Sequence, residues 1–362
     1  MTTYGKNIKI SIYGGSHDEE IGVVADGLPA GEGFDFDRLY AFMKRRAPGN
    51  AKYATARKEA DLPIFMSGVS SENILDGTTL KAVIKNSNQH SSDYSDLADT
   101  PRPSHADYPA RVKYGEGVDL RGGGHFSGRL TAPLCIVGGI CLQILEKMGI
   151  KVFAHIYSVK DENDTPFDLA SVGEAERLML SDRDFPTLSQ TAGERMKETI
   201  EAARLDCDSV GGIIECAVTG LPVGIGEHMF MGLEGRISSI VFSIPAVKAI
   251  EFGNGFECAS LFGSQNNDPF SISNGSVKTV TNNCGGILGG MSNGMPIVFR
   301  AAIKPTPSIL KEQDSVSLKR LENVKLLIKG RHDPCIVPRA VPVIEAAAAI
   351  AILDAILDEK AE

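Results

Sequence analysis

The chain has 362 residues, of which 43% are hydrophobic and 23% charged, and a formal net charge of −9. It is long enough to bury a large core, and its acidic balance argues against nucleic acid as a partner. The seven cysteines have no regular spacing, which indicates reduced thiols and a cytoplasmic location.

The N-terminal region predicts two strands and a helix. Ile8, Ile10 and Ile12 alternate with polar residues, the pattern of a half-buried strand, and residues 21–25 predict a second strand. Residues 35–46 predict a helix with basic residues in its last turn. Those side chains complement the helix dipole, so they have a structural explanation beside any functional one.

The stretch 102–131, RPSHADYPARVKYGEGVDLRGGGHFSGRLT, concentrates positive charge and glycine. Pro101 and Pro103 hold the arginine between them in an extended loop. The three glycines at 122–124 let the backbone come close to a ligand. Thr131 is expected to be the N-cap of the next helix, with a proline in the first turn. Such a loop suits a phosphate or carboxylate, although an ordinary solvated loop explains the composition equally well.

The rest of the chain mixes helices and strands without a regular βαβ rhythm, which favours an α+β fold in one domain over 1–362. The expected elements are a helix over 132–148, a strand over 150–159, helices over 172–181 and 191–205, strands over 211–219, 237–244 and 297–304, mixed signals over 316–329 and a buried helix over 343–357. The longest apolar runs, 132–142 and 346–353, are too short to span a bilayer and are expected to be buried. The first residues lack the apolar core of a signal sequence.

Three side chains in predicted loops suit proton transfer. His17 and His105 are histidines, a residue type whose side chain ordinarily titrates near neutrality, and Asp333 adds a carboxylate in the turn GRHDPC. A single loop histidine is more often structural, so the residue types alone do not assign a role.

A metal site and a nucleotide site are alternatives. The candidate metal ligands are His17, Asp18, His332, Asp333 and Cys335. They lack the paired spacing of zinc motifs, so no metal is predicted. There is no GxGxxG or GxxxxGK[ST] segment. The glycines at 285–290 and the proline-rich loop 304–308 remain as weak candidates for holding a phosphate.

The stretch 102–131 resembles the signature of the chorismate synthase family, an RPxHAD segment followed by RGGGRxSARET. Only 157–207, expected to be helical, contains no matching segment. The other matches are GGSHDEEIG at 14–22, RRAPG at 45–49, SIPAVKAIEFGNGF at 243–256, NNCGGILGGMSNG at 282–294, KPTPSI at 304–309 and GRHDPCIVPRAVPVIEA at 330–346.

The resemblance implies helices sandwiched between antiparallel sheets, in a homotetramer. It also implies a reaction: 5-enolpyruvylshikimate 3-phosphate loses phosphate by 1,4-anti elimination to give chorismate. Family members need reduced FMN although there is no net redox change. The C6 hydrogen is not next to a carbonyl, so a base alone would face a poorly stabilised carbanion, and transient electron donation from the flavin helps to expel phosphate.

The resemblance also assigns residues. His17 is implied to protonate the leaving phosphate, His105 to lie near flavin N1 and Asp333 to assist flavin N5. The implied residues for the anionic substrate or NADP are Arg45, Arg46, Lys52, Arg102 and Arg129. The implied FMN contacts are His125, Phe126, Ser127, Pro245, Ala246, Gly289, Lys304, Pro305, Thr306, Pro307, Ser308 and Arg331.

The chain departs from the family pattern near these residues. The departures are Gly15 and Asp18 beside His17, Ala47 in the RRRPG segment, and His125, Phe126, Gly128 and Leu130 in RSSARET. His125 thus replaces an arginine of the family pattern, and Leu130 replaces a glutamate. The resemblance implies that both changes alter the charge near the flavin.

Three functions remain open at this point. The first is an FMN-dependent chorismate synthase. The second is a relative that binds flavin or an anion without turnover. The third is a flavin oxidoreductase that consumes NADPH in proportion to turnover. The sequence does not tell whether the protein reduces FMN with NADPH or depends on an external flavin reductase, and no membrane partner is expected.

Overall fold

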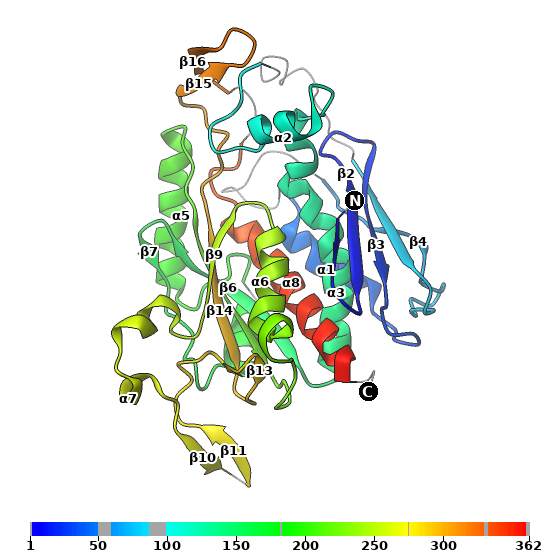
Figure 1. Cartoon of the computed structure of the whole chain (residues 1–362), viewed down its shortest axis with the longest axis vertical. Helices are drawn as coiled ribbons and strands as arrows, with labels where there is room; N and C mark the ends of the chain where they lie inside the picture. The colour runs from blue at the N-terminus through cyan, green and yellow to red at the C-terminus, as the bar shows by residue number, and fades with distance from the viewer. Residues whose placement is uncertain are drawn as a thin grey trace.

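Two five-stranded antiparallel sheets enclose the central helices of the fold (Figure 1). The computed structural model describes residues 2–49, 59–86, 99–181, 183–273, 275–328 and 332–359. The first sheet has the order β1-β2-β3-β5-β4 and the second β7-β6-β8-β14-β9. Their strands are β1 (Thr3–Tyr4), β2 (Lys9–Gly14), β3 (Glu20–Asp26), β4 (Ile64–Ser67), β5 (Leu80–Lys85), β6 (Lys151–Val159), β7 (Glu162–Asn163), β8 (Gly212–Thr219), β9 (Val247–Phe252) and β14 (Ile297–Ile303).

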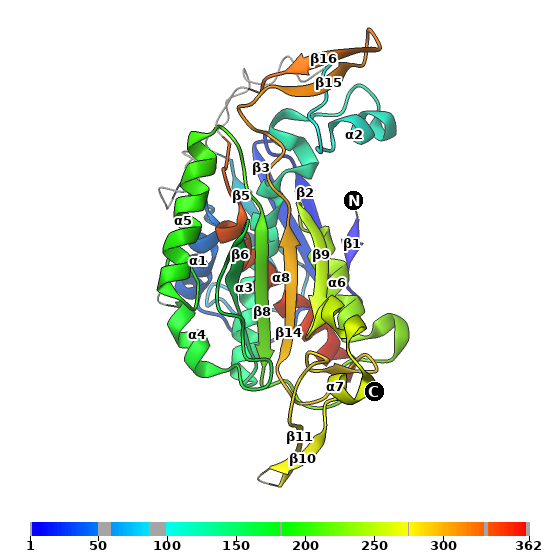
Figure 2. The same ribbon diagram turned by 90° about the vertical axis from the view of Figure 1, so that its left-hand side faces the viewer.

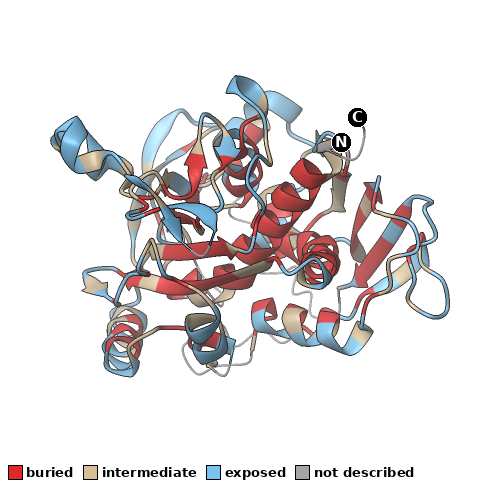
Figure 3. Cartoon of the chain, turned by 90° about the horizontal axis from the view of Figure 1, so that it is seen from below, coloured by how far each residue is buried: buried red, intermediate tan, exposed pale blue. Residues whose placement is uncertain are grey.

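Helices fill the space between the two sheets. These are α1 (Phe36–Arg46), α3 (Thr131–Lys147), α6 (Leu233–Ser243) and α8 (Val337–Glu359), and α8 contacts α1, α3, α6, β6 and β8. Figures 1 and 3 show these helices between the sheets, with buried residues on both inner faces. The α+β sandwich expected from the family resemblance is therefore present.

The second sheet has buried apolar side chains on both of its faces. Ile214, Cys216 and Val218 of β8 face the central helices, whereas Ala217 faces the opposite side. Since side chains alternate along a strand, one sheet can pack against helices on both faces. The other face is partly covered by α4 (Glu174–Ser181) and α5 (Gln190–Leu205), which lie along its β6–β7 side, as Figure 2 shows.

The two apolar helices pack closely through small residues. A Cβ added to Gly138 of α3 would lie 2.2 Å from the Cβ of Ala346 on α8. With flanking residues, Gly128–Lys147 and Val337–Asp358 are long and apolar enough to cross a membrane. The length argument made from the short apolar runs was therefore wrong. Their burial, 83% and 94% of each 18-residue window, marks them as core helices.

Small elements project from this sandwich. They are α2 (Asp107–Tyr114), α7 (Gly263–Asn266), the hairpins β10 (Phe270–Ser273)–β11 (Ser276–Thr279), β12 (Ile287–Leu288)–β13 (Met291–Ser292) and β15 (Gln313–Ser317)–β16 (Glu322–Leu326), and the 3₁₀ turns at Arg121–Phe126, Gly128–Leu130, Met229–Met231 and Gly255–Ser260. The sequence showed mixed helix and strand signals over 316–329. In the described part of that segment the structure has the end of β15, a turn and β16.

Two local predictions were wrong. The strand expected at 237–244 is the C-terminal part of α6, where Ile237, Ile240 and Val241 are buried at helical spacing. Burial against α8 outweighs the strand preference of these β-branched residues. Thr131 is the first residue of α3 rather than its N-cap, and its hydroxyl donates to the Gly128 carbonyl at 2.6 Å.

Candidate functional site

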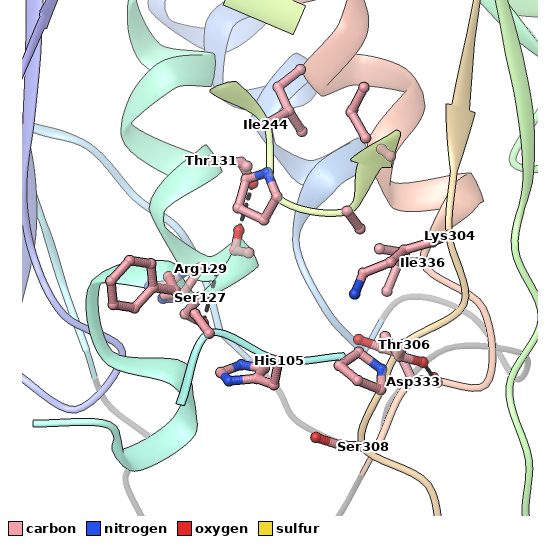
Figure 4. Close-up of a pocket in the computed structure, with 18 of the residues that line it drawn as sticks. His105, Ser127, Arg129, Thr131, Ile244, Lys304, Thr306, Ser308, Asp333 and Ile336 are labelled. Carbon is pink, nitrogen blue, oxygen red and sulfur yellow. Dashed lines mark hydrogen bonds between the residues drawn. The ribbon is translucent and has the colours of Figure 1, made fainter. Parts of the chain in front are cut away.

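A cavity of about 620 Å³ lies where the ends of several elements meet. Its walls come from the C-terminal ends of α1 and α6, the turns before α3, the segment after β14 and the start of α8. Figure 4 shows His105, Ser127 and Arg129 on one side, with Lys304, Thr306 and Asp333 opposite. Loops that are 200 residues apart in the sequence therefore form one site.

The triple-glycine turn lets two loops approach each other. Gly122, Gly123 and Gly124 all have positive φ, which other residues rarely adopt. A Cβ on Gly122 would lie 2.4 Å from Cε1 of His17, so the imidazole packs directly behind a residue that lines the cavity. The amide of Ser16 donates to the Gly124 carbonyl at 3.2 Å.

The cavity wall is strongly basic although the whole chain is acidic. Among the described residues, Asp333 is the one carboxylate in the wall. The basic residues there are Arg46, Arg102, Arg129, Lys248, Lys304 and Arg339. Such a local excess of positive charge attracts an anion.

Asp107 organises one side of the cavity. It accepts hydrogen bonds from Arg102 Nε at 2.7 Å and Nη2 at 2.8 Å, and it lies 2.6 Å from His105 Nδ1. Burial acts to raise the pKa of Asp107, but hydrogen bonds from Arg102 and His105 outweigh it and hold that pKa well below its usual range. An ionised Asp107 keeps a proton on Nδ1, so the other ring nitrogen can exchange protons with a ligand.

Asp61 plays the same role on the other side. Its buried carboxylate accepts from Arg46 Nη1 at 2.7 Å and from Arg129 Nη1. Burial acts to raise the pKa of Asp61, and the two guanidinium groups lower it below its usual value. Burial also lowers the pKa of Arg129 despite this partner.

The loop after β14 faces these arginines. Thr306 donates to the Asp333 carbonyl at 2.7 Å, and Asp333 accepts from Arg339 Nη1 at 2.6 Å. Burial lowers the pKa of Arg339 to about 10, so it remains a cation at neutral pH. Burial and the nearby Lys248 also lower the pKa of Lys304.

The turn after α6 lines the cavity with Pro245 and Ala246. Ala246 has a φ of 76°, and its carbonyl accepts from the Lys304 amide at 2.9 Å. A non-glycine residue with positive φ is uncommon and is often found at binding sites.

The residues that depart from the family pattern have structural partners here. His125 Nδ1 lies 2.6 Å from the Gly14 carbonyl oxygen and so carries the proton of that hydrogen bond. The Gly128 carbonyl accepts from Arg46 and Thr131. Leu130 packs against the central core.

The cavity brings together most of the residues singled out from the sequence. The lining residues among them are Arg46, Arg102, His105, His125, Phe126, Ser127, Arg129, Pro245, Ala246, Lys304, Thr306, Pro307, Ser308 and Asp333. His17 lies behind Gly122, and Pro305 stands between two lining residues. Lys52 and Arg331 lie outside the described residues.

Two of the expected residues lie elsewhere. Arg45 forms a two-pronged pair with Glu345 on α8, at 2.6 and 2.9 Å, outside the cavity lining. Gly289 lies in the β12–β13 turn, which is near the start of β14, while the cavity is at its end.

Sequence reasoning missed the residues that position the basic side chains. Asp107 is the last residue of the RPSHAD segment, and Arg339 lies within GRHDPCIVPRAV. Both therefore belong to segments that match the family pattern, and that match could have identified them. Asp61 and Asn86, which contact Arg129, had no such signal. A partner 40 to 70 residues away is visible only after folding.

Comparison with known proteins identifies the family. The family model described as chorismate synthase matches residues 8–357. Chorismate synthases of Lancefieldella parvula and Lachnoclostridium phytofermentans are 47% and 45% identical to this chain, over 98% of it and 95% of their own length. A crystal structure of a chorismate synthase has a TM-score of 0.76 at 26% identity and covers 98% of this chain and 93% of that one. The chain therefore belongs to the chorismate synthase family.

Proposed function

We propose that this protein is a chorismate synthase, a carbon–oxygen lyase that eliminates phosphate from 5-enolpyruvylshikimate 3-phosphate to give chorismate. This is the last common step of the shikimate pathway to the aromatic amino acids. Besides family membership, the observation that supports the proposal is the convergence of six basic side chains with His105 and Asp333 in one cavity. A substrate with two carboxylates and a phosphate needs such a cavity.

The cavity also fits reduced FMN. Its volume is within the range of small-molecule sites, and apolar side chains such as Ile244 and Ile336 can cover a flat ring. Lys304, Thr306 and Ser308 offer donors for the cofactor's phosphate. We therefore expect the FMN contacts at His125, Phe126, Ser127, Pro245, Ala246 and 304–308. Gly289 and Arg331 remain assigned by resemblance alone.

Bound reduced FMN would supply transient electron donation that helps to expel phosphate, and would take up the C6 hydrogen. The protein's own groups bind and orient the substrate and manage protons. Arg102 and Arg129 bind its anionic groups. His105, held at Nδ1 by Asp107, places its other nitrogen near Gly123, since a Cβ there would be 3.4 Å from Nε2.

Proton transfer to the leaving phosphate is assigned to His17, behind the triple-glycine turn. Asp333 accepts a hydrogen bond from Arg339 and is the carboxylate that we assign to the reactive edge of the flavin. Arg46 and Lys52 remain candidates for NADP or for the substrate phosphate. Arg45 is left out of the proposed ligand contacts, because Glu345 occupies its guanidinium.

We further propose a cytoplasmic homotetramer that works as one domain over 1–362. One continuous core cluster joins both sheets to the central helices, which supports the single domain. Large apolar side chains on the projecting α7–β10–β11 region are 67% to 82% exposed, and burial between subunits would explain them. They are Phe256, Phe262, Phe270 and Ile272.

An anaerobic assay tests the function directly. Purified protein is mixed with reduced FMN and 5-enolpyruvylshikimate 3-phosphate, and chorismate and phosphate are both measured. Equal amounts of the two products support the proposal. Flavin binding without products would support a non-catalytic relative, and NADPH consumption in proportion to product would support an oxidoreductase. Omitting NADPH shows whether an external flavin reductase is needed.

A further inference from the structure

Asp61 has a buried carboxylate that does not line the cavity but binds two arginines that do, Arg46 and Arg129. Its side chain is inaccessible to solvent and contacts Arg46 Nη1 at 2.7 Å and Arg129 Nη1. Its φ of 50° is in the left-handed region, where aspartate and asparagine are tolerated better than most residues. A buried ion is retained only with close partners, so the three residues act as a unit.

The two arginines that Asp61 binds have different further partners in the protein. All three guanidinium nitrogens of Arg46 have a protein acceptor: Thr131 Oγ1 at 3.1 Å, Asp61 at 2.7 Å and the Gly128 carbonyl at 2.9 Å. Arg46 therefore holds the turn before α3 in place. Its carbonyl also accepts from Arg339 at 3.0 Å.

Arg129 has one nitrogen without a hydrogen-bond acceptor among the described residues. Its Nε donates to Asn86 at 3.0 Å and its Nη1 to Asp61. Its Nη2 is buried without a hydrogen bond, and the Glu59 carboxylate is 3.8 Å away. This nitrogen lies on the Glu59 side, away from solvent, so it is Asn86 and Asp61 that hold the guanidinium in the cavity wall.

We propose that Asp61 is a positioning residue, which fixes the Arg129 guanidinium in the cavity wall so that Arg129 can bind an anionic group of the ligand. This inference rests on the proposed function in that it concerns the same anionic ligand. It does not require Asp61 to touch that ligand.

The substitution Asp61→Asn separates positioning from simple electrostatics, because the two predict opposite signs. Removing a negative charge behind a basic cavity should strengthen anion binding if only the electrostatic potential matters. If Asp61 positions Arg129, its loss frees the guanidinium and leaves two adjacent cations without their shared partner. We then expect the dissociation constant for inorganic phosphate, measured by titration calorimetry, to rise about tenfold.

Kinetics give a second readout. The KM for the shikimate phosphate ester should rise about tenfold in Asp61→Asn, with a smaller change in kcat, because binding rather than proton transfer is affected. Unchanged or tighter phosphate binding in the folded variant overturns the inference. Wild-type protein that binds no phosphate overturns the anion site itself, which is a different result.

The matched control is Asp354→Asn. Asp354 is also buried and paired with an arginine, Arg236, at 2.9 Å, but it lies near the end of α8 and does not line the cavity. It should lower the melting temperature without changing phosphate affinity. An equal loss of affinity in both variants, compared at the same folded fraction, counts against positioning.

A double-mutant cycle tests whether Asp61 affects phosphate binding through Arg129. In an Arg129→Gln background, Asp61→Asn should have little further effect on phosphate affinity, because the residue it acts through is gone. Additive losses contradict the inference. If Asp61→Asn fails to fold by circular dichroism, Asp61→Glu retains the charge but shifts the carboxylate, and it should also weaken phosphate binding.

Discussion

At the scale of single residues, Asp107 and Arg102 both contact Nδ1 of His105, at 2.6 and 3.2 Å, and this makes His105 the most informative one to change. Because Asp107 fixes Nδ1, the opposite nitrogen is available for proton transfer. We expect His105→Ala to lower kcat about 100-fold or more, measured as chorismate formed under saturating reduced FMN. His228→Ala is the control, because that imidazole is exposed and does not line the cavity. Near-full activity of His105→Ala would remove its proton role.

Asp107 should matter through the histidine tautomer and the position of Arg102. We expect Asp107→Asn to lower kcat about tenfold or more and to shift the pH–rate profile, because an amide no longer stabilises an imidazolium. The pKa of Asp107 is lowered in the folded protein. Its stabilising contribution is therefore present above the unfolded value of about 3.9 and is lost only as the pH falls below it. An unchanged pH–rate profile would contradict this assignment.

At the scale of elements, α3 and α8 can pack this closely only because residue 138 is a glycine, which has no side chain. A Cβ on Gly138 would lie 2.2 Å from the Cβ and 2.5 Å from the Cα of Ala346, so the helices must move apart. We expect Gly138→Ala to destabilise the protein by about 3 kcal/mol, measured by chemical denaturation. Gly117→Ala is the control, since a Cβ there meets nothing within 4 Å. Equal stability of the two variants would refute close packing.

A buried network of charged side chains links β6 and β8 of the second sheet to the segment that leads into α5. His155 of β6 lies 3.0 Å from Asp164 and 2.9 Å from Glu215, and Asp164 also accepts from the amides of Leu188 and Ser189. Burial acts to lower the pKa of His155, but its two carboxylate partners outweigh burial and raise it above 6.5.

The sign of the pH effect follows from that raised pKa. The ion pairs stabilise the fold fully below the unfolded value of about 6.5 and lose this effect as the pH rises through the folded pKa. We expect His155→Gln to lower stability by about 3 kcal/mol at pH 6, with a smaller difference from wild type at alkaline pH. Denaturation midpoints over this pH range measure it, with His228→Gln as the exposed control. A difference that does not change with pH would show that His155 is not a buried cation.

At the scale of the whole molecule, exposed apolar residues on the projecting hairpin predict assembly. We expect light scattering after gel filtration to give four times the chain mass of 38.7 kDa. Ile272→Asp should lower that mass, because a charge would be buried in the interface. Leu205→Asp, at an equally exposed apolar position at the end of α5, should leave it unchanged. A wild-type monomer would contradict the tetramer.

Much of the fold was predictable from local patterns. Alternating residues predicted β2 and β6, and helical spacing predicted α1 and α5, because each of these elements has the period of its own buried face. The buried helix α8 was predicted from a segment that is apolar almost all round. The segment at 237–244 failed because its β-branched residues favour a strand, and only packing against α8 selects the helix.

The sequence by itself determined the family, the layered fold and most of the residues that line the cavity, since all of these are carried by segments of adjacent residues. Only the tertiary structure decided which acceptors hold each basic side chain. Arg45 is engaged by Glu345, Arg46 by three acceptors, and Arg129 by Asn86 and Asp61, with the Glu59 carboxylate 3.8 Å from its remaining nitrogen. Those acceptors lie up to 300 residues away, and the cost of burying a charge depends on where they fall once the chain has folded.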